Sequence, residues 1–128
     1  MLKATHHVAI ICSDYAVSRH FYTEILKLSI LDENYRTDRD SYKLDLVLPD
    51  GTQLEVFSFP DAPKRPSFPE AQGLRHLAFT VDNMSKAVEW LIEQGIAVEP
   101  IRIDEYTGKR YTFFQDPDGL PLELCELQ

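Results

Sequence analysis

The chain has 128 residues, 44% hydrophobic and 27% charged, a balance typical of one small globular domain or two smaller halves. Its formal net charge is −8 and it has no long run of Lys or Arg, which argues against nucleic acid or an anionic membrane as partner. No apolar stretch approaches the roughly 20 residues that span a bilayer, and the first ten residues lack a secretory signal. We therefore expect a cytoplasmic protein with Cys12 and Cys125 as buried free thiols.

The first half of the chain, about residues 1–59, predicts a strand, a helix and three more strands. The expected strands are residues 5–12, 29–35, 42–49 and 52–59. The helix begins after a cap at Ser13 or Asp14. Its expected apolar stripe is Val17, Phe21, Ile25 and Leu28. A hairpin turn is indicated at Asp50-Gly51, between the last two strands.

The second half, about residues 74–128, follows a proline-rich segment and repeats the same order of elements. Residues 60–73 hold four of the eight prolines and have no periodicity, which is typical of a linker. The expected strands after it are residues 73–81, 96–103, 110–115 and 120–127. A helix capped by Asp82 or Asn83 should end at Gly95. This helix carries the apolar residues Ala87, Val88, Leu91 and Ile92.

Short motifs recur in the two halves in the same order. HVAI at residues 7–10 corresponds to HLAF at 76–79, and PDGTQLE at 49–55 corresponds to PDGLPLE at 117–123. Each half therefore carries one His near its start and one Glu near its end. An internal duplication explains the ordered set and predicts two modules related by a pseudo-two-fold axis.

Strand alternation gives these His and Glu residues a common direction. His7 and His76 share their strand faces with small residues. Glu55 and Glu123 point away from their apolar neighbours, so all four residues face one hollow if those neighbours pack on the helices. A lone His or Glu on a strand is usually an ordinary surface residue. Two imidazoles and two carboxylates, however, suit a divalent Zn, Ni, Co, Mn or Fe ion.

The chain resembles the vicinal oxygen chelate superfamily in four blocks, which are THHVAIICSDYAVSRHFYTEIL, QLEVF, GLRHLAFTV and DPDGLPLELCE. This superfamily includes glyoxalase I, bleomycin-resistance proteins and extradiol dioxygenases. The resemblance implies an α+β fold in which two tandem βαβββ modules form a cupped mixed sheet around a metal. It carries the metal ligands over to His7, Glu55, His76 and Glu123. His6 should point to the opposite face and have a structural role.

Two His with two Glu resemble the lactoylglutathione lyase pattern most closely. That reaction converts the hemithioacetal of a 2-oxoaldehyde into a hydroxyacyl thioester through an enediolate. The resemblance makes Glu123 the first candidate for the base and Glu55 the second. The thiol stays open, because the segment after Glu55 lacks the polar stretch that helps glyoxalase I hold glutathione.

Two other readings remain beside the lyase. One is a small-ligand or drug-binding protein without catalysis, and the other is a different metal enzyme of the group, an epimerase or a dioxygenase. The substrate is a small molecule in each reading, and its candidate cationic contacts are Arg36, Arg75, Arg102, Lys109 and Arg110. The aromatic residues that could line its pocket are Phe57, Tyr106 and Tyr111. We expect a homodimer, with the metal site either within one chain or across the dimer interface.

Overall fold

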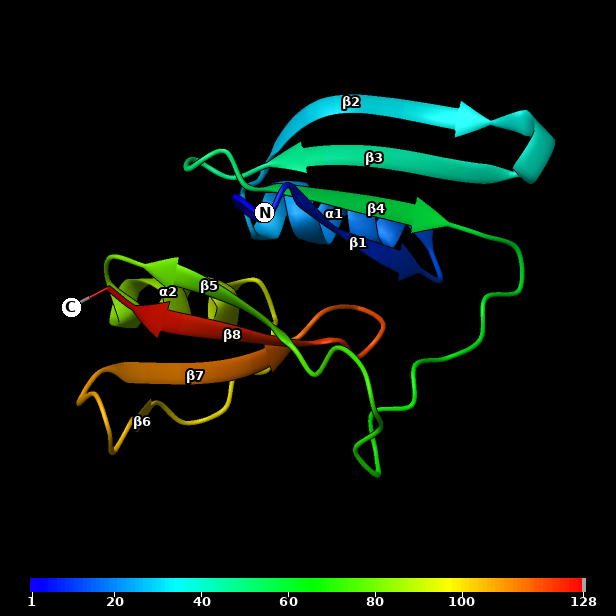
Figure 1. Ribbon diagram of the computed structural model, residues 1–128. Helices are drawn as coiled ribbons and strands as arrows, with labels where there is room; N and C mark the ends of the chain where they lie inside the picture. The colour runs from blue at the N-terminus through cyan, green and yellow to red at the C-terminus, as the bar shows by residue number, and fades with distance from the viewer. Residues whose placement is uncertain (128) are drawn as a thin grey trace. The chain divides into compact units, whose positions relative to one another are not determined.

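Each half of the chain folds into a four-stranded mixed sheet with a helix on one face (Figure 1). The computed structural model describes residues 1–127 and divides into two units, residues 1–64 and 65–128. This division falls inside the predicted linker 60–73, and Gln128 lies outside the described residues. No helix in residues 1–127 has the length and apolar character to cross a membrane. The predicted α+β class with two βαβββ repeats is confirmed.

The first unit contains the strands β1 (His7–Cys12), β2 (Ser29–Arg36), β3 (Ser41–Val47) and β4 (Gln53–Ser58). Its helical segments are α1 (Tyr15–His20), the π-helical turn η1 (Phe21–Ile25) and the 3₁₀ turn η2 (Thr37–Arg39). The strands lie in the order β1-β4-β3-β2. The first and last strands, β1 and β4, are parallel neighbours, whereas the other pairs are antiparallel.

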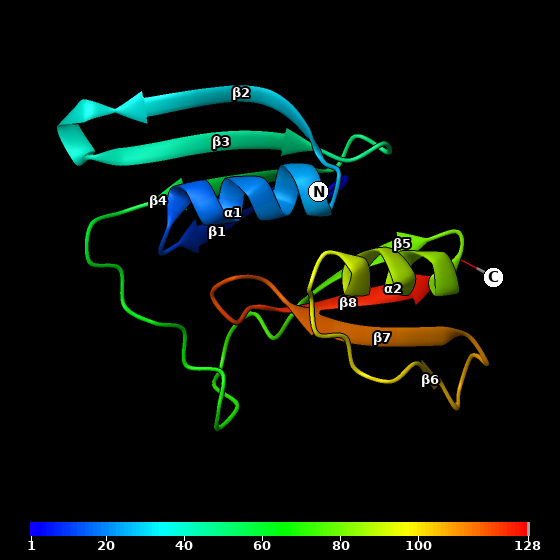
Figure 2. The same cartoon turned by 180° about the vertical axis from the view of Figure 1, so that it is seen from behind.

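The second unit repeats this topology with β5 (Leu77–Val81), α2 (Met84–Glu93), β6 (Arg102–Ile103), β7 (Arg110–Gln115) and β8 (Pro121–Glu126). Its sheet has the order β5-β8-β7-β6, with β5 and β8 parallel and the other pairs antiparallel. Figure 2 shows α1 on one face of the first sheet and α2 on one face of the second. We call the opposite face of each sheet its open face.

Local sequence signals fix the ends of several elements. Asp14 accepts a hydrogen bond from the Val17 amide, and Asn83 caps α2 in the same way. In the β3–β4 hairpin, the Gly51 amide donates to the Leu48 carbonyl at 2.9 Å. Gly51 has a φ of +92°, a conformation that costs glycine little because it has no Cβ. The sequence therefore specifies these turns and caps directly.

The core of each unit lies between the sheet and its helix. In the first unit the buried strand residues Leu44, Leu46, Leu54 and Val56 alternate with half-buried residues of the open face. In the second unit Leu122 and Leu124 on β8 are buried in the same alternating pattern. The apolar neighbours of Glu55 and Glu123 are thus the core residues, as the alternation predicted.

Two apolar residues of the predicted helices are exposed. Val17 is 50% exposed, because the buried side of α1 and η1 runs through Ser18, Tyr22 and Ile25. Ile92 is 59% exposed, since it follows Leu91 by a rotation of about 100° around α2. Apolar periodicity predicted the position of each helix correctly, but the buried face of each helix is narrower than its apolar residues suggest.

The predicted strand 96–103 is largely wrong, because only Arg102–Ile103 forms a ladder with β7. Pro100 has no amide hydrogen and therefore cannot continue a ladder. Glu99 joins β7 through single contacts: its amide donates to the Phe113 carbonyl at 2.9 Å, and its carbonyl accepts from the Thr112 hydroxyl at 2.7 Å. The predicted strand 73–81 begins only at Leu77.

A polar network ties α1 to β2 in the first unit. The Arg19 guanidinium donates to both carboxylate oxygens of Glu33, at 2.7 and 3.2 Å, and the Tyr15 hydroxyl also donates to Glu33. The Tyr15 ring stacks on Tyr42, with ring centroids 4.0 Å apart. The hydrogen bonds from Arg19 and then from Tyr15 lower the pKa of Glu33.

Truncating a core leucine should destabilise the first unit far more than truncating an exposed one. Leu54 is 1% exposed, whereas Leu31 is 53% exposed. We expect Leu54→Ala to lower the unfolding free energy by about 2–5 kcal/mol, through lost burial and the cavity left behind. Leu31→Ala, the matched control, should change it by less than about 1 kcal/mol. Urea denaturation followed by circular dichroism measures both, and equal effects would contradict the assigned core.

The Glu33 network should make part of the stability depend on pH. Because folding lowers the pKa of Glu33, its contribution is present above the unfolded pKa and is lost as the pH falls through the lower folded pKa. The network is partly exposed, so we expect Glu33→Gln to cost about 1 kcal/mol at pH 7 and less at about pH 3. Urea denaturation at both pH values measures this, with Glu105→Gln as an exposed control. A Glu33→Gln penalty that stays constant between them would be inconsistent with the network.

Candidate metal centre

His7 and Glu55 lie together on the open face of the first sheet. The parallel register of β1 and β4 pairs Ala9 with Glu55, which leaves His7 two residues earlier on the same face. The His7 Nε2 atom is 3.4 Å from a carboxylate oxygen of Glu55. The His7 side chain is 40% exposed and that of Glu55 15% exposed. The His7 imidazole is thus accessible to solvent, whereas most of the Glu55 side chain is buried.

His76 and Glu123 form the equivalent pair in the second unit. Ala78 pairs with Glu123 in the parallel register of β5 and β8, and His76 precedes β5 by one residue. The His76 Nε2 atom lies 2.9 Å from a carboxylate oxygen of Glu123. The duplicated sequence therefore produces a duplicated His–Glu pair.

Each unit supplies one imidazole and one carboxylate. A single metal site formed by all four side chains stays a prediction, because the two pairs belong to different units. Residues 1–127 contain no group of three or more His, Cys, Asp or Glu side chains that could hold an ion. The donor chemistry of the pairs nevertheless fits a borderline divalent metal, since imidazole nitrogen and carboxylate oxygen suit Zn, Ni, Co, Mn and Fe.

Lys43 and Asp45 lie beside Glu55 and are not among the site residues predicted from the sequence. The Lys43 ammonium is 2.7 Å from an Asp45 oxygen and 3.9 Å from a Glu55 oxygen. The hydrogen bond to Asp45 is the main cause that raises the pKa of Lys43. Alternation in YKLDLVL was the available signal, since Leu44 and Leu46 are core residues and their neighbours must face the open side.

The surroundings of Glu123 are aromatic and neutral instead. Phe113 pairs with Glu123 across β7 and β8, and its ring meets the His76 ring edge to face at a centroid distance of 5.1 Å. The Cys125 thiol donates to a Glu123 oxygen at 3.1 Å. Burial, followed by this hydrogen bond, raises the pKa of the Cys125 thiol to about 11. The two halves thus repeat the His–Glu pair but differ in what surrounds it.

Two of the candidate arginines lie on open faces and stack on aromatic rings. The Arg36 guanidinium carbon is 5.1 and 5.7 Å from the ring centres of Phe57 and Phe59. In the other unit, the Arg102 carbon is 5.1 and 5.6 Å from the ring centres of Tyr111 and Phe113. Of the expected aromatic lining, Phe57 and Tyr111 therefore contact an arginine.

The other candidates are placed differently. Arg110 ion-pairs with Glu126 at 2.6 Å, and strand alternation puts it on the helix side of β7. Lys109 lies in the loop before β7. Tyr106 is 89% exposed in that same loop. In the first unit the predicted opposite orientation of His6 is wrong: His6 precedes β1, so strand alternation does not apply to it, and its Nδ1 lies 2.9 Å from His7 Nδ1.

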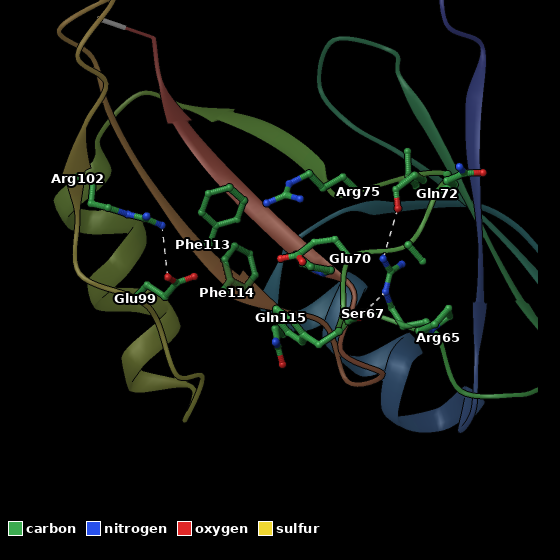
Figure 3. Close-up of a pocket in the computed structure, with 16 residues that line it drawn as sticks. Arg65, Ser67, Glu70, Gln72, Arg75, Glu99, Arg102, Phe113, Phe114 and Gln115 are labelled. Atoms are coloured by element: carbon green, nitrogen blue, oxygen red, sulfur yellow. Dashed lines mark hydrogen bonds and ion pairs between the residues drawn. The ribbon is translucent and has the colours of Figure 1, made fainter.

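A pocket with a volume of about 490 Å³ opens on the second unit (Figure 3). Residues 65–75 form one side of it, and the open face of the sheet forms the other through Phe113, Gln115 and Pro121. Arg75 and Arg102 both line this pocket. Two of the predicted cationic contacts therefore meet in one cavity, next to the His76–Glu123 pair.

Comparison with known proteins places this arrangement in a family. The family model described as the Glyoxalase/Bleomycin resistance protein/Dioxygenase superfamily matches residues 4–124. The Bacillus subtilis protein YwkD is 59% identical over 98% of both chains. The Escherichia coli protein YaeR is 57% identical over 98% of this chain and 97% of its own. A crystal structure of a glyoxalase family protein from Enterococcus faecalis is 52% identical and superposes with a TM-score of 0.90, over 97% of this chain and 98% of that one.

More distant relatives include two whose names state a reaction. The metallothiol transferase FosB of Staphylococcus saprophyticus is 28% identical over 97% of this chain and 77% of its own. A 2-epi-5-epi-valiolone epimerase from an Actinomyces species is 30% identical over 97% of this chain and 79% of its own. The superfamily thus includes enzymes that resemble this chain over nearly its whole length.

Proposed function

The chain belongs to the Glyoxalase/Bleomycin resistance protein/Dioxygenase superfamily, and we propose that it is a metal-dependent lyase or isomerase of the glyoxalase I type. Its substrate would be the hemithioacetal of a 2-oxoaldehyde or a related small carbonyl compound. The observation that carries this proposal is the repeated His–Glu pair. The distance from the histidine Nε2 atom to a glutamate carboxylate oxygen is 3.4 Å on the first sheet and 2.9 Å on the second.

His7, Glu55, His76 and Glu123 are the residues that would hold the ion. Both pairs are on open faces, so their donor atoms are not used to fill either core. Four protein ligands would leave room for substrate or water on an ion that accepts more than four ligands. When bound, a divalent cation would supply positive charge that stabilises negative oxygens formed when a proton leaves a carbon beside a carbonyl.

Glu123 is the residue we assign to proton transfer. It would take the proton from the carbon next to the carbonyl and return it to the neighbouring carbon, while the electron pair of the broken C–H bond passes to the carbonyl. Glu55 is the weaker candidate, because Lys43 and Asp45 surround it with an ion cluster. The groups around Glu123 are the Cys125 thiol and Phe113, together with its partner His76.

An epimerase is the second candidate, favoured by the relative of that activity with 30% identity. An epimerase that works through proton transfer inverts a carbon centre by removing a proton and returning it to the opposite face. The same His–Glu pairs would serve such a reaction, but returning a proton to the opposite face needs a second proton donor besides Glu123, for which Glu55 is the candidate. The two candidates therefore differ in product and in whether one carboxylate or two transfer protons.

Metal binding should depend on both histidines. We expect His7→Ala and His76→Ala each to lower the zinc or nickel retained after dialysis by about tenfold or more, because each removes one nitrogen ligand. His20→Ala is the matched control, since His20 is an exposed residue of α1 outside both pairs. Elemental analysis of the purified variants measures the retained metal. Full retention in both pair variants would exclude this metal centre.

Replacing the assigned base should remove turnover and leave the fold intact. We expect Glu123→Gln to lower the rate of product formation by about 10²-fold or more. Glu126→Gln changes the same group on the same strand but on the helix side, and should keep most of the rate. The measurement is NMR in heavy water, which follows product formation as well as deuterium incorporation, with hemithioacetals of methylglyoxal made from several thiols and with candidate epimerase substrates. A metal-loaded wild type inactive in every case would overturn the assigned chemistry.

A further inference from the structure

The pocket of the second unit carries more positive charge than its own residues neutralise. Its lining contains three guanidinium groups, Arg65, Arg75 and Arg102, and two carboxylates, Glu70 and Glu99. Arg102 is already paired with Glu99, with a nitrogen–oxygen distance of 3.3 Å. One positive charge of the lining is therefore left for a ligand to balance.

Arg75 is the guanidinium available to that ligand. Arg65 donates to neutral groups, the Ser67 hydroxyl at 2.8 Å and the Leu74 carbonyl at 3.3 Å, which brace residues 65–75. Among the residues that the structure describes, no hydrogen bond or ion pair engages Arg75. A guanidinium presents a planar fork of donors that matches a carboxylate or a phosphate.

The side of the pocket formed by the second sheet includes an aromatic ring. The Phe113 ring lines the pocket, and the guanidinium carbon of Arg102 lies 5.6 Å from its centre. In Figure 3 the side chains of Arg75 and Arg102 reach toward Phe113 from different elements. Phe113 also contacts His76 edge to face, so the pocket lies directly beside one of the His–Glu pairs. A volume of about 490 Å³ suits a ligand of ordinary metabolite size.

We propose that this pocket binds the substrate through a carboxylate or phosphate held by Arg75, with a flat apolar part of the same molecule against Phe113. This identification of the occupant rests on the proposed function, since it takes the ligand to be the substrate of the His–Glu site. It narrows the carbonyl substrate to an anionic molecule. Arg102 is paired with Glu99 and lies over the Tyr111 and Phe113 rings, so its charge is already balanced and Arg75 is left for the anion.

Calorimetric titration of chelator-treated protein tests the pocket without metal and without turnover. The probes are benzoylformate for a carboxylate, phenyl phosphate for a phosphate, and methyl benzoylformate as the neutral ester. We expect one or both anions to bind and the ester to bind at least about tenfold more weakly. Arg75→Gln should raise the Kd of the bound anion by about tenfold or more, which corresponds to loss of a charge-assisted contact.

Arg110→Gln is the matched control, because Arg110 belongs to the same unit but is paired with Glu126 outside the pocket. It should leave the Kd within about twofold. The inference is wrong if neither anion binds, if the ester binds as tightly, or if Arg75→Gln and Arg110→Gln behave alike. If the protein binds the anion but catalyses no proton exchange with any substrate, the proposed function alone is refuted. If it catalyses proton exchange but Arg75→Gln does not weaken anion binding, the pocket proposal alone is refuted.

Discussion

The parallel pairing of the first and last strands is the constraint on which the candidate site depends in each unit. It sets Ala9 opposite Glu55 and Ala78 opposite Glu123. A histidine placed two residues before that alanine then shares a face with the carboxylate. A shift of one residue in either register would turn the imidazole or the carboxylate into the core. Burial of the leucine and valine side chains that flank the two glutamates therefore keeps both carboxylates on the open faces. The same alternation along the strand determines the core packing and the position of the candidate ligands.

Strong local patterns made much of this predictable from the sequence. Period-two alternation gave the direction of Glu55 and Glu123, and cap and turn residues such as Asp14 and Gly51 gave element boundaries. Comparison of the two halves predicted the repeated topology, because two copies of one sequence pattern must satisfy the same packing constraints. The βαβββ order of each half and its His–Glu pair followed from these features without knowledge of any distance, whereas the fold class was what the family resemblance implied.

What escaped prediction depends on contacts between different segments of the chain. Lys43 and Asp45 lie next to Glu55 because of the register between β3 and β4, which alternation within one strand does not give. The pocket requires residues 65–75 to lie against the open face of the second sheet, and a segment without periodicity gives no sign of such a position. Residues 96–103 are apolar and β-branched, yet Pro100 and the short pairing of β6 leave most of them outside the ladder. The halves therefore share a scaffold and differ in lining, ionic beside Glu55 and aromatic beside Glu123.

The proposed function requires a metal bound by nitrogen and oxygen atoms, and its proposed ligands come from both halves. X-ray absorption spectroscopy of the zinc- or nickel-loaded protein reads the ligand atoms directly. The predicted spectrum has a first shell of nitrogen and oxygen at about 2.0–2.2 Å, with the outer-shell scattering of two imidazoles and no sulfur. A first shell that contains sulfur, or one without imidazole scattering, would contradict the account, because Cys12 and Cys125 have no place in the proposed ligand set.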